Sequence, residues 1–291
     1  MTSSSISIIP SVNYHVLEAC NMRCKFCFAP FKDAKGILKK GFLVKEDALS
    51  LLKEISRLGF KKITFAGGEP TLYPWITDLI VEAKNLGMTT MIVTNGTNIN
   101  DEFLNKHKGV LDWIILSIDS FIPDVNIQSG RAINGKKAFT TDDYLKMINL
   151  INEHGFKLKI NTVVHQFNYE ESFLDFISMS KTERWKVFQV LPIKGENDKY
   201  IEQFKITDHE FNQFLSNHQT LIDSGILVPE SNSQMVDSYV MIDPVGRFYT
   251  NKKGYQEYSK SILEVGVYEA YKEMDYNIPK FLARNGMYDW D

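Results

Sequence analysis

The three cysteines of this chain, Cys20, Cys24 and Cys27, constrain it more than any other feature of its sequence. They are the only cysteines in 291 residues, and the gaps between them are three and two residues long. One tight loop can therefore turn all three sulfurs toward a common point. Thiolates are soft ligands that favour iron–sulfur clusters, zinc or copper. A [4Fe–4S] cluster held by three cysteines would leave one iron open to a small ligand.

Two other interpretations of the cysteines are weaker. Structural zinc would need a fourth ligand, for which His15 is the only nearby candidate. Cysteines that pack as small hydrophobic residues have no reason to lie within eight positions of one another. The stretch therefore predicts a loop that binds an iron–sulfur cluster.

Composition and charge exclude several classes of function. Hydrophobic residues make up 44% of the chain and charged residues 24%, as in ordinary globular proteins. The net charge of −3 argues against nucleic-acid or anionic-membrane binding, which would need a basic excess. Clustered cysteines indicate metal binding in a reducing compartment. Since we find neither a membrane-length apolar run nor an N-terminal signal, we expect a cytoplasmic protein without a membrane partner.

Strand-like and helix-like segments alternate between residues 11 and 192. The predicted strands cover residues 12–19, 61–66, 88–94, 111–119, 157–164 and 185–191. The predicted helices cover residues 45–58, 75–86, 101–106, 142–153 and 170–179. Six β/α units with right-handed crossovers predict an α/β fold, a partial (β/α)6 barrel with a parallel sheet.

The pattern changes after residue 192. A capping box at Thr207 and Glu210 predicts a helix that ends near residue 218. Residues 238–243 and 247–250 should form a hairpin, and residues 263–274 a last helix. We therefore expect a flexible N-terminus (1–10), the partial barrel (11–192) and a C-terminal extension (193–291) packed on the barrel.

The end of the second predicted strand carries Gly67, Gly68 and Glu69. In parallel α/β folds, ligands bind at the carboxyl ends of the strands. The two glycines would allow a ligand to approach the backbone closely, and the carboxylate could accept a hydrogen bond from a cationic amine. Taken alone, the stretch is more typical of an ordinary turn from strand to helix.

The next two strand ends are also polar. Asn95 follows the third strand, and Ser117 and Asp119 alternate onto one face of the fourth. Arg131 follows in a Ser-Gly-Arg sequence and could bind a carboxylate, although an exposed surface position would suit it as well.

Basic residues alternate on the fifth and sixth strands. Lys159 and Asn161 share one face of the fifth strand, and Arg184 and Lys186 share one face of the sixth. Lysines inside a barrel are costly without an anionic partner, so this pattern favours a triphosphate or similar polyanion. The alternative is a solvated outer face. Further candidates for the same patch are Lys62, Lys252 and Lys253.

The cysteine motif, Cys-x-x-x-Cys-x-x-Cys with Phe26 before the last cysteine, resembles the signature of radical S-adenosylmethionine (SAM) enzymes. In that superfamily the amino and carboxylate groups of SAM chelate the open iron. The resemblance implies a [4Fe–4S] cluster and SAM as cofactors. It also implies a set of cofactor-binding residues near the cysteines, namely Phe26, Gly67, Gly68, Glu69, Asn95, Ser117, Asp119 and Arg131.

Within the superfamily, the chain resembles the viperin subfamily from residue 11 onward. The matching stretches include Ser11-Val12-Asn13-Tyr14-His15, Arg184-Trp185-Lys186-Val187-Phe188-Gln189, Val228-Pro229-Glu230-Ser231-Asn232 and Ser259-Lys260-Ser261-Ile262-Leu263. The amphipathic membrane-binding helix of vertebrate viperin is missing here, so the resemblance gives no reason to expect a membrane location.

This resemblance implies that a 5′-deoxyadenosyl radical removes the 4′-hydrogen of a nucleoside triphosphate. Loss of the 3′-hydroxyl and one further reduction would then give a 3′-deoxy-3′,4′-didehydro product for antiviral defence. CTP is the expected substrate, with UTP and GTP as alternatives. The expected partners are the nucleotide and an electron donor such as a flavodoxin or ferredoxin, and we expect a monomer.

The resemblance also assigns the residues of the nucleotide site, which the C-terminal extension would complete. Tyr239 would donate hydrogen or position the ribose, although a core aromatic residue is an equal alternative. Arg284 would close over the phosphates. The full set of substrate-binding candidates is Asn13, Lys62, Lys159, Asn161, Arg184, Lys186, Lys252, Lys253 and Arg284.

Two rival functions remain at this point. One is another radical SAM modification of a nucleotide or peptide, but the lack of cysteines after Cys27 excludes an auxiliary cysteine-bound cluster. The other is a nucleotide-binding or zinc-stabilised interaction protein without turnover.

Overall fold

A computed structural model describes residues 8–31 and 33–290 of the chain. It contains one ten-stranded sheet in the order β10-β9-β8-β1-β2-β3-β4-β5-β6-β7. The strands are β1 (Ser11–His15), β2 (Lys62–Ala66), β3 (Thr89–Thr94), β4 (Trp113–Ser117), β5 (Lys157–Val164), β6 (Arg184–Gln189), β7 (Leu227–Glu230), β8 (Val240–Ile242), β9 (Arg247–Thr250) and β10 (Glu257–Ser261).

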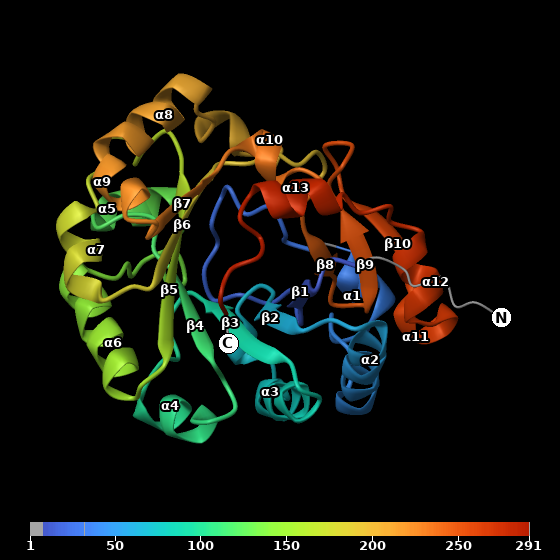
Figure 1. The fold of residues 1–291 in the computed structure, drawn as a ribbon. Helices are drawn as coiled ribbons and strands as arrows, with labels where there is room; N and C mark the ends of the chain where they lie inside the picture. Colours follow the sequence, from blue (N-terminus) through green and yellow to red (C-terminus); the bar gives the residue numbers. More distant parts are fainter. Residues whose placement is uncertain (1–7, 32, 291) are drawn as a thin grey trace.

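The helices cover mainly the outer side of this sheet, which curves around the centre of the molecule (Figure 1). They are α1 (Ala34–Ile37), α2 (Lys45–Leu58), α3 (Ile76–Asn85), α4 (Asp101–His107), α5 (Pro123–Ser129), α6 (Thr141–Glu153), α7 (Leu174–Ser180), α8 (Asp208–Asn217), α9 (Gln219–Asp223), α10 (Asn232–Met235), α11 (Ile262–Val265), α12 (Val267–Lys272) and α13 (Ile278–Ala283). Short 3-10 turns lie at Pro70–Leu72 and Ile201–Gln203.

The predicted α/β fold with a partial parallel barrel is confirmed. All six expected strands form, and β1 to β6 pair in parallel in sequence order. Helix α2 shows why the helices could be predicted from the sequence. Its apolar residues recur every three or four positions, and Gly59, with a φ of 107°, ends the helix. The buried side of α2 comprises Ala48, Leu51, Leu52, Ile55 and Leu58.

The C-terminal extension continues the sheet at both of its ends. Strand β7 pairs in parallel with β6, and β8 pairs in parallel with β1. The hairpin of β8 and β9 forms as predicted, and β10 adds an antiparallel edge. Because the extension supplies strands to the barrel sheet, it is built into the barrel wall as well as packed against it.

Several elements differ from the prediction for identifiable reasons. Strand β7 was not predicted, because it has only four residues and contains Pro229. Proline has no N–H to donate to a neighbouring strand, so it occurs mainly in edge strands. The expected helix 263–274 is two helices, α11 and α12, because Gly266 between them has a φ of 82° and a ψ of 152°. The polar strand β10 and the short helices α5 and α13 were not predicted.

Alternate residues of the parallel strands point to the inside of the curved sheet. The inner positions include Thr64 on β2, Ile115 on β4 and Asn161 on β5, which all line one cavity. The residues between them pack against the helices in the main hydrophobic core, as Ile63 and Ile160 do. Successive residues of a strand therefore point alternately into the cavity and into the hydrophobic core, as the sequence pattern indicated.

The N-terminus tests two sequence-based expectations only in part. Of the segment 1–10, expected to be flexible, residues 1–7 lie outside the described residues. Ile9 is buried, and its backbone N–H donates to the Tyr271 hydroxyl at 3.2 Å. Within the described ranges, none of the helices has the length and apolar character needed to cross a bilayer.

Candidate active site

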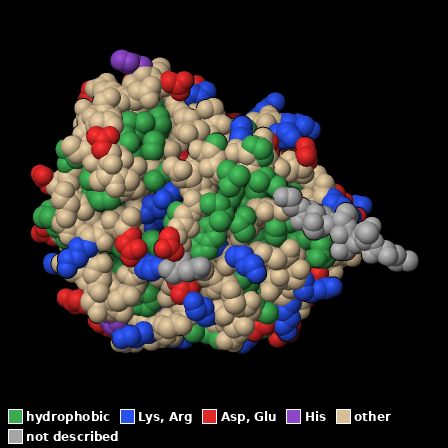
Figure 2. All heavy atoms as spheres, viewed as in Figure 1, with side chains coloured by type: hydrophobic (Ala, Val, Ile, Leu, Met, Phe, Trp, Pro, Cys, Tyr) green, Lys and Arg blue, Asp and Glu red, His purple; other side chains and the backbone are tan. Residues whose placement is uncertain are grey.

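A cavity of about 580 Å³ opens inside the curved sheet. Its wall combines the cysteine loop, the inner faces and carboxyl ends of the strands, and residues of the C-terminal extension. Figure 2 shows one face of the molecule, with hydrophobic side chains gathered near its middle and Lys and Arg side chains beside them. A cavity of this size and position is typical of a binding site for a cofactor and a small substrate.

The cysteine loop follows β1 and is held by the C-terminal end of α5 and the glycine after it. The Arg23 N–H donates to the Gly130 carbonyl at 3.0 Å, and the Lys25 N–H donates to the Ser129 carbonyl at 2.8 Å. A Cβ at Gly130 would lie 2.1 Å from the Arg23 carbonyl oxygen, so only glycine fits there. The loop is fixed by its backbone, which leaves its side chains free to hold a ligand.

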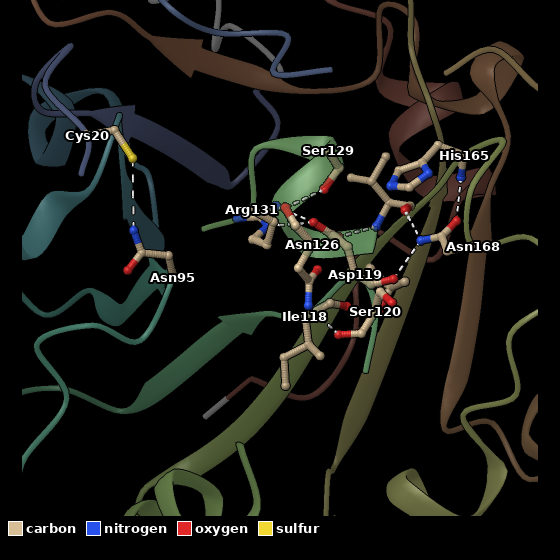
Figure 3. Close-up of polar contacts among 12 residues, drawn as sticks. Cys20, Asn95, Ile118, Asp119, Ser120, Asn126, Ser129, Arg131, His165 and Asn168 are labelled. Carbon is tan, nitrogen blue, oxygen red and sulfur yellow. Dashed lines mark hydrogen bonds and ion pairs between the residues drawn. The ribbon is translucent and has the colours of Figure 1, made fainter. Parts of the chain in front are cut away.

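All three cysteines line the cavity, as predicted. Burial raises the pKa of the Cys24 thiol to about 12 and also raises the pKa values of Cys20 and Cys27. The Met22 N–H lies 3.4 Å from the Cys20 sulfur, and the Asn95 amide lies 3.9 Å from it (Figure 3). Weak donors around a thiolate stabilise and tune a bound cluster.

The donor set of the loop suits an iron–sulfur cluster. All three of its cysteines are free, and thiolates are the ligands that such clusters prefer. In a [4Fe–4S] cluster each cysteine binds a different iron, so the thiolates surround the ligand instead of meeting at one point. His15, the candidate fourth zinc ligand, packs edge-on against Phe31 and Tyr249, with ring centroids at 4.9 and 5.8 Å.

Gly67 and Gly68 allow a close backbone approach, but the partner is the chain itself. Added Cβ atoms would lie 2.8 Å from the Leu17 carbonyl oxygen at Gly67 and 2.2 Å from the Ala19 carbonyl oxygen at Gly68. The Glu69 N–H also donates to Ala19, at 2.9 Å. These glycines fit the strand end against the residues that lead into the cysteine loop, and both also line the cavity, so the close approach of a ligand stays a prediction.

The Glu69 carboxylate is fully buried and accepts four protein hydrogen bonds. Oε1 accepts from the Thr71 N–H at 3.1 Å, from the Thr71 hydroxyl at 2.7 Å and from the Thr94 hydroxyl at 2.7 Å. Oε2 accepts from the Asn95 N–H at 2.8 Å. This side chain ties the end of β2 to the end of β3, and it also lines the cavity, so its contact with the amino group of SAM stays a prediction.

Glu69→Gln should therefore destabilise the fold as well as the SAM site. Glutamine offers one acceptor oxygen, and its NH2 group would face a donor, so we expect a loss of about 1–3 kcal/mol in the free energy of unfolding. SAM should bind more weakly because Asn95 shifts, whereas nucleotide affinity should change little. Denaturant unfolding and titrations would measure this, with the exposed Glu102→Gln as control. A Glu69→Gln protein with the parental free energy of unfolding and the parental SAM affinity would contradict this prediction.

Ser117 and Asp119 both line the cavity, which confirms that they share a face. Asp119 forms an ion pair with Arg131, whose Nε and Nη2 lie 2.6 and 2.5 Å from Oδ2 (Figure 3). Burial alone would lower the pKa of the Arg131 guanidinium, but the Asp119 carboxylate outweighs this and raises it. Oδ1 of Asp119 accepts from the Val163 N–H at 2.8 Å. Arg131 thus presents its remaining N–H groups to the cavity beside Phe26, whose ring centroid is 5.8 Å from the guanidinium.

Basic side chains gather at the opposite end of the strands from the cysteines. Lys62 begins β2, Lys159 and Lys186 lie on β5 and β6, and Arg284 follows α13; these four line the cavity and are buried. Burial and mutual repulsion place the pKa values of Lys62 and Lys159 well below the usual range for lysine. For neither lysine do the described residues provide an ion-pair partner; the aromatic tail residue Tyr288 lies over both instead. The inward lysines predicted from alternation are therefore confirmed.

Arg184 and the two lysines near the hairpin do not line the cavity. The Arg184 guanidinium lies 4.2 Å from the Tyr288 ring centroid and donates to the Asn285 carbonyl at 3.0 Å, which places it behind the C-terminal tail. Lys252 and Lys253 are exposed and pair with Asp275 and Glu257 at 3.0 and 2.8 Å. The structure thus removes these two lysines from the predicted patch, because the turn after β9 directs them outward.

Two asparagines lie between the basic end and the cysteine end. Asn161 is level with Ser117 and Lys186 in the sheet, and Asn13 lies on β1; both line the cavity. The Asn161 Oδ1 atom is buried without a hydrogen-bond partner among the described residues. Buried amides seek partners, so this oxygen is suited to accept from a ligand hydroxyl.

Tyr239 lines the cavity next to a carboxylate that the sequence analysis did not assign to the site, Glu230. The Tyr239 hydroxyl donates to Glu230 and accepts from Lys186 at 3.1 Å. Arg284 lies over its ring, with the guanidinium carbon 3.6 Å from the centroid. Glu230 lies in a stretch of viperin resemblance, and that was the available signal; its partners come from distant parts of the chain.

Comparisons with known proteins identify the family of this chain and agree with its fold. Residues 14–179 match the model of the family described as "Radical SAM superfamily". A protein of Lacinutrix mariniflava named S-adenosylmethionine-dependent nucleotide dehydratase is 52% identical over 290 residues, which span 99% of this chain but only 60% of that protein. A protein of Flammeovirga pacifica with the same name is 50% identical, with 99% and 98% coverage. Among solved structures, native anSMEcpe with bound AdoMet has a TM-score of 0.70 at 16% identity, covering 94% of this chain and 82% of that one, which shows a shared fold.

Proposed function

Because this chain belongs to the radical SAM superfamily and, within it, to the S-adenosylmethionine-dependent nucleotide dehydratases, we propose that it converts a nucleoside triphosphate, CTP first of all, into the 3′-deoxy-3′,4′-didehydro analogue. The cofactors are a [4Fe–4S] cluster, for which Cys20, Cys24 and Cys27 are the ligands, and SAM. The site residues supporting this proposal are those that line the cavity.

The observation that carries the substrate class is the charge at the far end of the cavity. Four buried cations, Lys62, Lys159, Lys186 and Arg284, line this end of the cavity. Of these, Lys186 and Arg284 pair with one buried carboxylate, Glu230. Unpaired buried cations are costly, and a triphosphate would supply the missing negative charge through charge-assisted hydrogen bonds. A neutral peptide side chain would not.

The two ends of the strands would orient the nucleotide, with its phosphates at the basic end and its ribose toward the cysteine loop. Strand β2 starts at Lys62 and ends at Ala66, roughly 13 Å away, just before the glycines that fit against the cysteine loop. A triphosphate held at Lys62 would place the ribose near Asn161 and Tyr239, between the phosphates and SAM. The cavity walls exclude water and hold the 4′-hydrogen within reach.

When bound, the reduced cluster and SAM supply a 5′-deoxyadenosyl radical that removes the 4′-hydrogen. Asn161 and Tyr239 hold the ribose for this step, and the basic residues hold the phosphates. The 3′-hydroxyl then leaves as water after taking up a proton, and a second electron completes the double bond. A protein such as a flavodoxin or ferredoxin would donate both electrons. The enzyme itself would be a cytoplasmic monomer.

The proposal is tested by anaerobic incubation of the reconstituted protein with SAM, a reductant and each of the four nucleoside triphosphates. We expect CTP to stimulate formation of 5′-deoxyadenosine and to give a nucleotide lighter by one water. A preference for UTP or GTP would keep the reaction and change the base. SAM cleavage that no nucleotide stimulates, with every nucleotide unchanged, would refute the proposal.

Tyr239→Phe tests the residue placed beside the ribose. The change removes the hydroxyl but keeps the ring under Arg284, so SAM cleavage should continue while the didehydro product forms at least several-fold more slowly. The ratio of product to 5′-deoxyadenosine measures this directly, with Tyr276→Phe as a control away from the cavity. If ratio and rate both stay parental, Tyr239 has only a packing role.

A further inference from the structure

The carboxylate of Glu230 lies behind the cavity wall and joins three residues that face the cavity. Glu230 ends β7 and is 0% exposed, and it is not itself part of the cavity lining. Its Oε1 atom accepts from Lys186 and, at 3.3 Å, from Arg284. Its Oε2 atom accepts from the Tyr239 hydroxyl. One carboxylate therefore contacts two of the residues proposed to bind the phosphates and the tyrosine proposed to lie beside the ribose.

We propose that Glu230 is a positioning residue that couples the phosphate site to Tyr239. Its carboxylate fixes the direction of the Tyr239 hydroxyl and holds Lys186 and Arg284 in place before the nucleotide arrives. The inference rests on the proposed function and adds to it a residue that never touches the substrate.

The hydrogen bonds define which way the tyrosine hydroxyl points. Tyr239 donates its proton to Glu230, and its oxygen accepts from the Lys186 ammonium at 3.1 Å. Both of the groups that orient the hydroxyl are thus charged and buried, and charge-assisted hydrogen bonds are the strong ones. A phosphate that draws Lys186 toward itself would remove the second of these bonds and leave the first. Phosphate occupancy therefore changes the hydrogen bonding of Tyr239 directly.

Glu230 also keeps Lys186 charged. Burial lowers the pKa of Lys186 to about 8, and the Glu230 carboxylate opposes this. The other charged groups around Lys186 are cationic and favour the neutral amine: Arg284 beyond α13, Arg184 on the same strand, Lys62 on β2 and Lys159 on β5. Without the carboxylate, Lys186 would lose its proton at a lower pH. Triphosphate affinity would then fall at a lower pH than in the parental protein.

The test is Glu230→Gln, which keeps the shape and removes the charge. At pH 8.5 we expect CTP to bind about tenfold more weakly than to the parental protein, the lower end of the effect of one charge-assisted hydrogen bond. At pH 6.5 binding should be parental or tighter, because an anion near the phosphates is gone. The ratio of didehydro product to 5′-deoxyadenosine should fall. The exposed Glu183→Gln is the matched control and should change none of these values.

A double-mutant cycle shows whether Glu230 acts through Tyr239. In a Tyr239→Phe background, Glu230→Gln should lower the product ratio no further. Glu230→Asp keeps the charge but cannot reach the hydroxyl, so it should keep the parental pH dependence and lower the ratio. This variant also decides the matter if Glu230→Gln does not fold.

The inference is overturned if Glu230→Gln weakens CTP equally at both pH values and leaves the product ratio unchanged, since Glu230 would then only stabilise the fold. A parental product ratio in Glu230→Asp overturns it as well. Failure of the parental protein to bind or convert any nucleotide would instead remove the proposed function, so the two failures are distinguishable.

Discussion

Replacing Cys24 by alanine should abolish the iron–sulfur cluster and all cleavage of SAM. The chain has three thiols, all of which line one cavity, so the variant is left with two. The sequence holds no cysteine outside this loop, and the nearby His15 packs edge-on against Phe31. Two thiolates cannot hold a [4Fe–4S] cluster with one open iron.

Iron and sulfide analysis after anaerobic reconstitution would measure the loss, together with the cluster absorbance and 5′-deoxyadenosine. Lys25→Ala is a suitable control because it alters the same loop and keeps every thiol. Its backbone bond to Ser129 does not depend on the side chain. A Cys24→Ala protein with parental iron content and SAM cleavage would disprove the assignment of the cluster ligands.

The alternation of residues along a strand predicted which side chains face inward, but not how deep each one lies. Lys186 and Arg184 share a face of β6 and were expected to act alike. Lys186 is the third residue of the strand and reaches the cavity, whereas Arg184 is the first and lies behind the tail. Depth depends on the register with neighbouring strands and on the tail, which are tertiary features.

Residue chemistry alone also could not predict which charged groups are already partnered. Glu69 and Asp119 both line the cavity as expected, but the sequence did not show that Thr71, Thr94 and Asn95 donate to Glu69 or that Asp119 binds Arg131. Thr71 is only two positions from Glu69, but Thr94 and Asn95 lie at the end of another strand, and Arg131 is 12 positions from Asp119. The cysteine loop was predictable because its chemistry is contained within eight consecutive residues. Glu230 was not, because its partners lie between nine and 54 positions away.

The buried lysines at the basic end of the cavity should lower the stability of the ligand-free protein while strengthening nucleotide binding. Lys159 is 7% exposed, and the described residues offer it no carboxylate at ion-pair distance. Lys159→Met keeps the length of the side chain and removes the charge. We expect the ligand-free variant to gain about 1–4 kcal/mol in the free energy of unfolding, because replacing a poorly compensated buried charge by an apolar group is often stabilising. The same change should weaken CTP binding by about 10- to 150-fold, since one charge-assisted contact is lost.

The pH dependence gives this prediction a second readout. The pKa of Lys159 is lowered in the folded protein, so the unfolded chain binds more protons below the usual lysine range. The contribution of Lys159 to stability therefore rises as the pH is raised from neutral toward 10, and the stability gain from Lys159→Met should shrink over that range. Denaturant unfolding at pH 7 and 9.5 and calorimetric titration with CTP and CMP would measure both effects, with the exposed Lys106→Met as control. If Lys159→Met lowers both stability and CTP affinity, Lys159 supports the fold. If the variant binds CTP with parental affinity, the nucleotide does not contact Lys159.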